Sequence, residues 1–218
     1  MHTVPNTLTH ERVVAFVDYH NTLHALRRVG RQIDLPALRD YLAEGRHLVE
    51  VFLYIATHPD PEQQQADRGT LHRLRQHGFL VRTKVGHILP NGRLKCDLDM
   101  ELALDVQAFV ARARPDIVVL VTGDGDFTPL AQRLRFDGVR VEVASVPGSV
   151  SAELRAMANG FVDLTRLGDV VDYLPIPKPD VALDDAFDAD LLDEFDLAPE
   201  EDAPAATPAA PARIPLAA

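Results

Sequence analysis

The 218-residue chain has a single cysteine, Cys96, and only three lysines. One cysteine excludes an intramolecular disulfide and any zinc cluster built on several thiolates. The longest aliphatic run is the five residues 117–121, whereas a membrane-spanning helix needs about 20 apolar residues. The first residues carry His2, Pro5 and His10 where a signal peptide would place an apolar stretch. We therefore expect a cytoplasmic protein that does not associate with membranes.

Several common catalytic signatures are also missing. The chain has neither a Walker phosphate loop nor a Gly-x-Gly-x-x-Gly fingerprint. Ser149 and Ser151 lack the Gly-x-Ser-x-Gly setting of an acyl-transfer nucleophile. His20 and His24 are spaced to share one helical face, but no third metal ligand is evident. We interpret both histidines as surface or crevice-edge residues rather than as half of a zinc site.

The net charge of −11 belongs almost entirely to one end of the chain. Residues 172–218 contain twelve acids and two bases, whereas residues 1–171 are nearly neutral. The same end is rich in Pro and Ala, so it buries too little apolar surface to offset chain entropy. We predict a flexible N-terminus at 1–11, one domain at 12–171 and a disordered acidic tail at 172–218. Alternating acids and large apolar residues in the tail either form a solvated spacer or dock on a protein partner.

Apolar runs and helical segments alternate through the predicted domain. We expect strands at 13–17, 48–55, 79–85, 117–121, 139–144 and 161–164. We expect helices at 22–28, 36–45, 61–77, 97–113 and 127–136, another opening at Ser149, and a turn at 90–92. Apolar strands separated by single helices favour an α/β fold with a mainly parallel sheet covered on both faces. Such sheets bind ligands beyond the carboxyl ends of their strands.

Carboxylates gather where that binding crevice is expected. Asp18 ends the first strand, with Asn21 three residues on, and Asp124 and Asp126 follow the fourth. Asp99 lies at the start of the preceding helix and flanks its apolar stripe, where a charge needs a partner or a metal. All-oxygen ligands suit Mg²⁺ or Mn²⁺ rather than zinc. Such ions can activate a water for phosphodiester cleavage.

Neighbouring acids have simpler interpretations. Asp97 suits the first turn of a helix because it complements the helix dipole. Asp105 lies nearly two turns further along, and we expect it to pair with an arginine. Asp126 would also suit the cap of the helix that follows it.

Four blocks of the sequence, in order, resemble NYN domains of the PIN-like nuclease superfamily. VVAFVDYHN (13–21) is similar to the family's first strand, and KCDLDMELALD (95–105) to its Lys-Gly-x-x-Asp helix start. VVLVTGDGDFTPLAQRLRFDGVRVEVAS (118–145) is similar to its Ser-Gly-Asp-x-Asp-Phe stretch, and SAELRAMANGFVDL (151–164) to its closing helix and strand. The resemblance is to the LabA-like subgroup and covers about residues 12–165.

The resemblance implies a Rossmann-like, three-layer α/β/α sandwich and a Mg²⁺- or Mn²⁺-dependent ribonuclease that uses a metal-activated water. Carried over by position, the catalytic and metal-binding residues are Asp18, Asp99, Asp124 and Asp126. The residues predicted to contact the substrate are Asn21, Lys95 and Thr122. The oligomeric state is not indicated.

Three positions depart from the family pattern. Cys96 replaces a usual glycine and Thr122 a usual serine, and both changes are mild. Asn159 stands where the family often has an aspartate before the last strand, which would remove one acid near the sheet edge. The four central acids are intact, and this favours activity.

RNA is the substrate that the resemblance implies. Two groups of bases would either grip phosphates near the acids or serve as ordinary surface charge. They are Arg27, Arg28 and Arg31, and Arg82, Lys84, Arg93 and Lys95. Few aromatic residues lie near the expected crevice, so only one or two bases can stack there. We expect single-stranded or structured RNA with little sequence preference.

Two other functions stay open. The segment from Asp124 to Thr128 fits the Asp-x-Asp-x-Thr nucleophile loop of haloacid-dehalogenase-like phosphatases, but the lysine that this chemistry needs does not follow until Lys178. The other alternative is a catalytically weak adaptor that binds RNA or a protein partner and works through its acidic tail.

Overall fold

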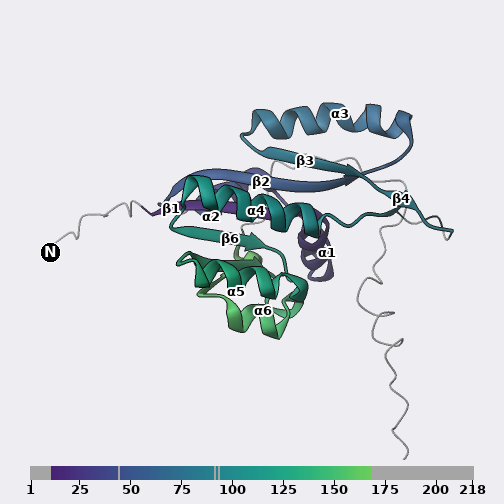
Figure 1. The fold of residues 1–218 in the computed structure, drawn as a ribbon. Helices are drawn as coiled ribbons and strands as arrows, with labels where there is room; N and C mark the ends of the chain where they lie inside the picture. Colours follow the sequence, from purple (N-terminus) through teal and green to yellow (C-terminus); the bar gives the residue numbers. More distant parts are fainter. Residues whose placement is uncertain (1–10, 44, 91, 93, 168–218) are drawn as a thin grey trace, which may run out of the picture. The chain divides into compact units, whose positions relative to one another are not determined.

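A computed structural model of the chain describes residues 11–43, 45–90, 92 and 94–167 (Figure 1). The predicted acidic tail lies outside these residues, as does the predicted flexible N-terminus apart from Glu11. The proposed division of the chain therefore stays a prediction. Within the described residues, no helix combines the length and the apolar character needed to cross a membrane.

Strands and helices alternate along the described chain. The strands are β1 (Arg12–Asp18), β2 (His47–Thr57), β3 (Leu80–Val85), β4 (His87–Ile88), β5 (Leu94–Lys95), β6 (Ile117–Val121), β7 (Arg140–Ser145) and β8 (Gly160–Asp163). The helices are α1 (Tyr19–Arg28), α2 (Leu35–Ala43), α3 (Pro61–Gln76), α4 (Asp99–Ala113), α5 (Thr128–Phe136) and α6 (Ala152–Met157). Short 3₁₀ turns are η1 (Gly125–Phe127), η2 (Pro147–Ser149) and η3 (Leu164–Arg166).

Six parallel strands form the main sheet, in the order β3-β2-β1-β6-β7-β8. This confirms the predicted α/β fold. β4 and β5 form a separate antiparallel hairpin around the predicted turn. The strand order runs outward in both directions from the β1–β6 pair, and doubly wound sheets bind ligands at such a reversal. A ligand site is therefore expected just beyond Asp18 and Val121, where β1 and β6 end.

The two central strands are apolar because both of their faces are covered. Residues 13–17 of β1 have no exposed surface, and residues 117–121 of β6 are equally enclosed. Alternate residues of a strand point to opposite faces, so Val13 and Val17 join one apolar cluster while Val14 and Phe16 join the other. Continuous apolar runs of this kind are typical of parallel strands between two helical layers.

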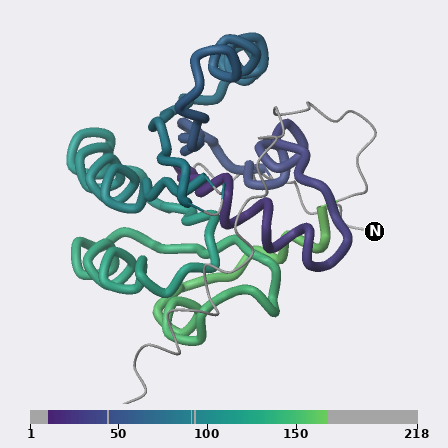
Figure 2. Tube along the Cα trace, turned by 90° about the vertical axis from the view of Figure 1, so that its right-hand side faces the viewer, coloured from purple at the N-terminus to yellow at the C-terminus, as the bar shows by residue number. Residues whose placement is uncertain are grey.

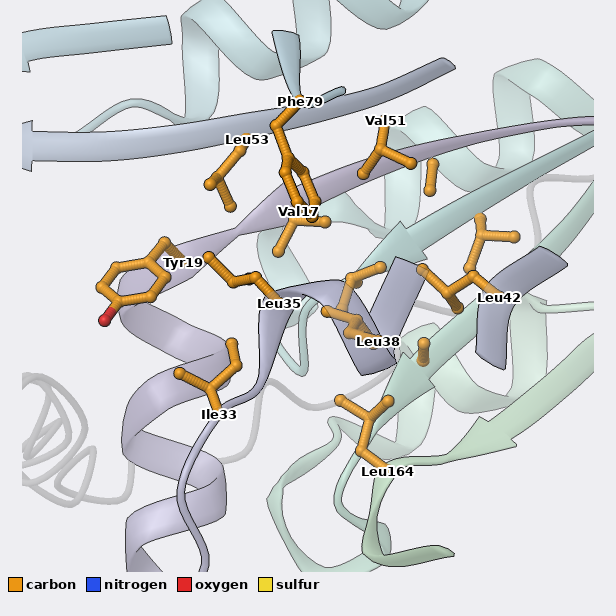
Figure 3. Packing of buried hydrophobic residues seen from close by; sticks show 14 of the residues in the cluster. Val17, Tyr19, Ile33, Leu35, Leu38, Leu42, Val51, Leu53, Phe79 and Leu164 are labelled. Atoms are coloured by element: carbon orange, nitrogen blue, oxygen red, sulfur yellow. The ribbon is translucent and has the colours of Figure 1, made fainter. Parts of the chain in front are cut away.

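Helices cover both faces of the sheet (Figures 1 and 2). One face packs against α1 and α2, and Figure 3 shows Leu38 and Leu42 of α2 among side chains of the sheet. The opposite face packs against α4, α5 and α6, through residues such as Leu102, Leu130 and Leu154. The architecture is therefore the three-layer sandwich that the resemblance implied.

Helix α1 lies across the carboxyl edge of the sheet. Near its start, the Thr22 hydroxyl donates to the carbonyl of Val121 at the end of β6, at 3.1 Å. Just beyond its end, Arg31 Nη1 donates to the carbonyl of Leu167, which follows β8, at 2.6 Å. Figure 2 shows this helix, in purple, crossing from the middle of the sheet. It therefore follows the edge of the sheet where the ligand site is expected.

Helix starts are where the sequence prediction was least accurate. Helix α1 begins at Tyr19 rather than at residue 22, because Asp18 Oδ1 accepts a hydrogen bond from the Asn21 amide and caps it. The last helix is capped by Ser151, whose hydroxyl accepts from the Leu154 amide. Ser149, the predicted start, belongs instead to the 3₁₀ turn η2.

Candidate metal centre

In the loop after β6, backbone amides donate hydrogen bonds to side-chain oxygens, which fix the conformation of the loop. Asp124 Oδ1 accepts from the Asp126 amide at 2.9 Å, which caps η1. The Thr122 hydroxyl accepts from the Asp124 amide at 3.2 Å. Asn21 Oδ1 accepts from the Gly123 amide at 2.8 Å. The last bond joins the loop to α1, so it fixes the two strand ends relative to each other.

Gly123 is required by close packing. A Cβ atom at this position would lie 1.9 Å from the Ser149 carbonyl oxygen, far inside van der Waals contact. The Gly123 carbonyl also accepts from the Ser151 amide at 2.8 Å. The segment 149–151 therefore fixes the acidic loop from outside. Sequence reasoning missed this role, because only the fold brings residues 123 and 149 together.

Three carboxylates from two elements meet beyond the carboxyl edge. Asp99, at the start of α4, and Asp124 and Asp126, after β6, can each offer one oxygen within 4.8 Å of the others. Asp99 and Asp124 are partly buried, and Asp126 is exposed. Asp18, at the end of β1, lies close enough for its charge to act on Asp99 and to feel that of Asp124. All four predicted acids thus surround one region.

The neighbouring carboxylates raise one another's pKa values. Burial, followed by the charge of Asp124 and Asp97, raises the pKa of Asp18 from 3.8 to about 6, against the lowering effect of its hydrogen bond from Asn21. Burial and four neighbouring carboxylates raise the pKa of Asp99 to about 7. A bound cation would reverse this effect, because it favours the charged form of each ligand. The all-oxygen donor set fits a hard divalent ion.

A lysine and a further acid hold Asp99 in place. Asp97 Oδ1 accepts from the Asp99 amide at 2.9 Å. Asp97 precedes Leu98, the N-cap of α4, so it does not lie in the first turn as the sequence suggested. Lys84 Nζ donates to the Asp97 carbonyl at 2.8 Å and to Glu101 Oε1 at 2.6 Å. Lys84 was predicted as a candidate phosphate contact. The structure instead shows it tying the segment before α4 to the edge strand β3.

Asp105 has the arginine partner expected from the sequence. Its Oδ2 atom accepts from Arg82 Nε at 3.1 Å and from the Tyr54 hydroxyl at 3.0 Å. Arg82 was the other β3 candidate for phosphate binding, and this ion pair engages it. Arg93, from the same predicted group, lies outside the described residues.

The residues predicted to contact the substrate have different surroundings. Asn21 is partly buried, and its Oδ1 atom is engaged by the acidic loop. Thr122 is 2% exposed and its hydroxyl is bonded to the loop, which argues against a substrate contact. Lys95 is exposed on β5, opposite His87 in the hairpin. Two of the three residues therefore serve to orient the loop.

Two other predicted features have structural explanations. His20 Nε2 accepts from the Ala56 amide at 3.0 Å, and burial with nearby positive charge lowers its pKa to about 4. It is a neutral residue that joins α1 to β2. Asn159 Oδ1 accepts from the Val141 amide, at the amino end of β7. The acid that is missing at Asn159 would therefore lie at the edge of the sheet away from the carboxylates.

Comparison with known proteins gives three findings. The family model of the NYN domain matches residues 12–165. The low amplitude and bright protein LabA of Synechococcus elongatus is 29% identical over 179 residues, which cover 78% of this chain and 93% of that protein. A crystal structure of a protein of unknown function from Vibrio parahaemolyticus superposes with a TM-score of 0.59 at 28% identity, covering 75% of this chain and 96% of that one.

Proposed function

Because the chain belongs to the NYN domain family, we propose that it is a metal-dependent ribonuclease that hydrolyses RNA phosphodiesters. Membership of this family, within the PIN-like nuclease superfamily, indicates a nuclease-type function. The observation that carries the finer proposal is the convergence of Asp99, Asp124 and Asp126 beyond the β1–β6 reversal, with Asp18 beside them.

We assign each acid a role in holding Mg²⁺ or Mn²⁺ rather than in attacking the substrate. The four ligands are Asp18, Asp99, Asp124 and Asp126. Bound there, divalent ions supply Lewis-acid activation of a water and neutralise charge on the leaving oxygen. Asn21 and Thr122 position the loop that carries two of the ligands, and Lys95 remains a candidate substrate contact from the hairpin.

The phosphatase alternative has no support in the site. Its chemistry needs a lysine near the nucleophile loop, and the lysines within the described residues are Lys84 and Lys95. Lys84 is bonded to Glu101 and to the backbone of Asp97, and Lys95 lies on the hairpin. The family match over residues 12–165 includes this loop, so Asp124 belongs to an NYN domain.

The test is cleavage of labelled RNAs of mixed sequence in Mn²⁺. Wild type, Asp124→Asn and Asp40→Asn are purified identically, and each is assayed with and without EDTA. Asp40 is an exposed acid on α2, outside the carboxylate group, so it controls for loss of one negative charge. We expect wild type and Asp40→Asn to cleave, EDTA to stop both, and Asp124→Asn to be inactive.

Two results would contradict the proposal. Cleavage that survives in Asp124→Asn would mean a contaminating nuclease or a site elsewhere. Absence of both cleavage and Mn²⁺ binding, the latter measured by calorimetry, would favour the adaptor function. Folding of each variant is checked by thermal melting, so that an inactive but unfolded protein is not mistaken for a supporting result.

A further inference from the structure

One side of α1 is polar, carries no acid and ends in two exposed arginines. The buried residues of the helix are Tyr19, Thr22, Leu23, Ala25 and Leu26. The remaining positions recur at helical spacing on one side. His20 is engaged there with the Ala56 amide of β2. The others form what we call the α1 polar face: Asn21 and His24, which are partly buried, and Arg27 and Arg28, which are exposed. Both arginines lie in the last turn, where they also complement the helix dipole.

The α1 polar face begins at the carboxylates. Asp18 caps the helix, and Asn21 is bonded to the acidic loop. Arg28 follows Asn21 by seven residues, which is about 10 Å along a helix. The bonds of Thr22 and Arg31 hold α1 along the carboxyl edge over this distance. The face therefore leads from the carboxylates along the carboxyl edge of the sheet.

The carboxylates repel one another, and the two arginines lie at the other end of α1. The charges that act most strongly on the pKa values of Asp18 and Asp99 are those of other carboxylates. Arg27 and Arg28 are exposed at the far end of the helix. An RNA strand bound through a cation at the acids would bring further phosphates close to the same carboxylates. Those phosphates would be repelled unless positively charged side chains lay next to them.

We propose that the α1 polar face binds the backbone of single-stranded RNA, with Arg27 and Arg28 contacting phosphates that flank the cleaved one. This rests on the proposed ribonuclease function and deepens it. A guanidinium pairs with phosphate through charge-assisted and often bidentate hydrogen bonds. Phosphate contacts orient the strand without reading bases, so this surface predicts binding with little sequence preference.

The test measures RNA binding rather than cleavage. The probe is a fluorescein-labelled 12-nucleotide oligouridylate, titrated by anisotropy at several salt concentrations. All proteins are full-length and carry Asp124→Asn, so that the probe stays intact. Arg27→Gln/Arg28→Gln is compared with Arg73→Gln/Arg75→Gln. The second pair lies in the last turn of α3, which leads into the amino end of β3 rather than its carboxyl end.

We expect the α1 double variant alone to weaken binding. Losing two phosphate contacts on a single strand should make the slope of log affinity against log salt shallower by about 1.4. Extrapolated from 1 M salt, this corresponds to roughly tenfold weaker binding at 0.15 M. The α3 double variant should have the same salt slope and the same affinity as the parent protein, which carries Asp124→Asn alone.

The outcomes separate the two proposals. If the α1 and α3 variants share the slope of the parent, the α1 surface is refuted while RNA binding stands. If the parent does not bind the RNA at all, the ribonuclease function fails and this inference fails with it. Thermal melting of both double variants excludes unfolding as the cause of weak binding.

Discussion

Replacing Asp18 by Asn should stabilise the metal-free protein while abolishing cleavage. Asp18 caps α1 through an oxygen that accepts from the Asn21 amide, and asparagine provides an equally good cap. The substitution therefore keeps the local hydrogen bond and removes only the charge. That charge is unfavourable in the folded protein, because burial and the nearby carboxylates oppose it.

The size of the effect follows from the pKa of Asp18. Its rise from 3.8 to about 6 corresponds to about 3 kcal/mol at about 1.4 kcal/mol for each pH unit. Since the folded-state pKa lies above the ordinary value, the penalty is absent below about pH 4, grows between pH 4 and 6, and is complete above. Asp18→Asn should therefore raise the free energy of unfolding by up to about 3 kcal/mol at pH 8. At pH 4 the difference should be small.

Urea unfolding in EDTA at pH 4 and pH 8 measures both values. The same titration with Mn²⁺ should reverse the order at pH 8, because the wild type binds the ion more tightly and gains more from it. Asp40→Asn is the matched control and should resemble wild type throughout. The reasoning would be refuted if Asp18→Asn were no more stable than wild type at pH 8 in EDTA. It would also be refuted if the substitution stabilised the protein as much at pH 4 as at pH 8.

Two further substitutions test the frame around the carboxylates. Gly123→Ala should destabilise the protein by at least about 2 kcal/mol, because its Cβ would meet the Ser149 carbonyl at 1.9 Å. Gly148→Ala, which has open space, should unfold like wild type, and equal unfolding curves for the two variants would contradict the packing argument. Lys84→Met should leave the protein folded but weaken Mn²⁺ binding roughly tenfold, since Lys84 holds the segment before Asp99. Calorimetry that finds unchanged Mn²⁺ affinity would show that this contact does not position the acid.

The strand positions and the candidate acids could be read from the sequence for a physical reason. A central parallel strand is buried on both faces, so 117–121 had to be an unbroken apolar run, and the prediction matches β6. The sequence predicted the first residues of the helices less accurately. Asp18 was seen as a strand end but also caps α1, and capping by a neighbouring side chain decided where that helix begins.

The sequence by itself determined the fold class, the family resemblance and the acids that follow β1 and β6. These follow from the hydrophobic pattern and the motif spacing within each segment, which can be read without knowing which other segments it packs against. Only the tertiary structure decided which charges are engaged with each other. From the sequence, Lys84 and Arg82 could either bind phosphate or be ordinary surface charge; in the fold they form ion pairs with Glu101 and Asp105 of α4. Which side chains meet depends on how distant segments pack, and pairwise spacing along the chain does not encode it.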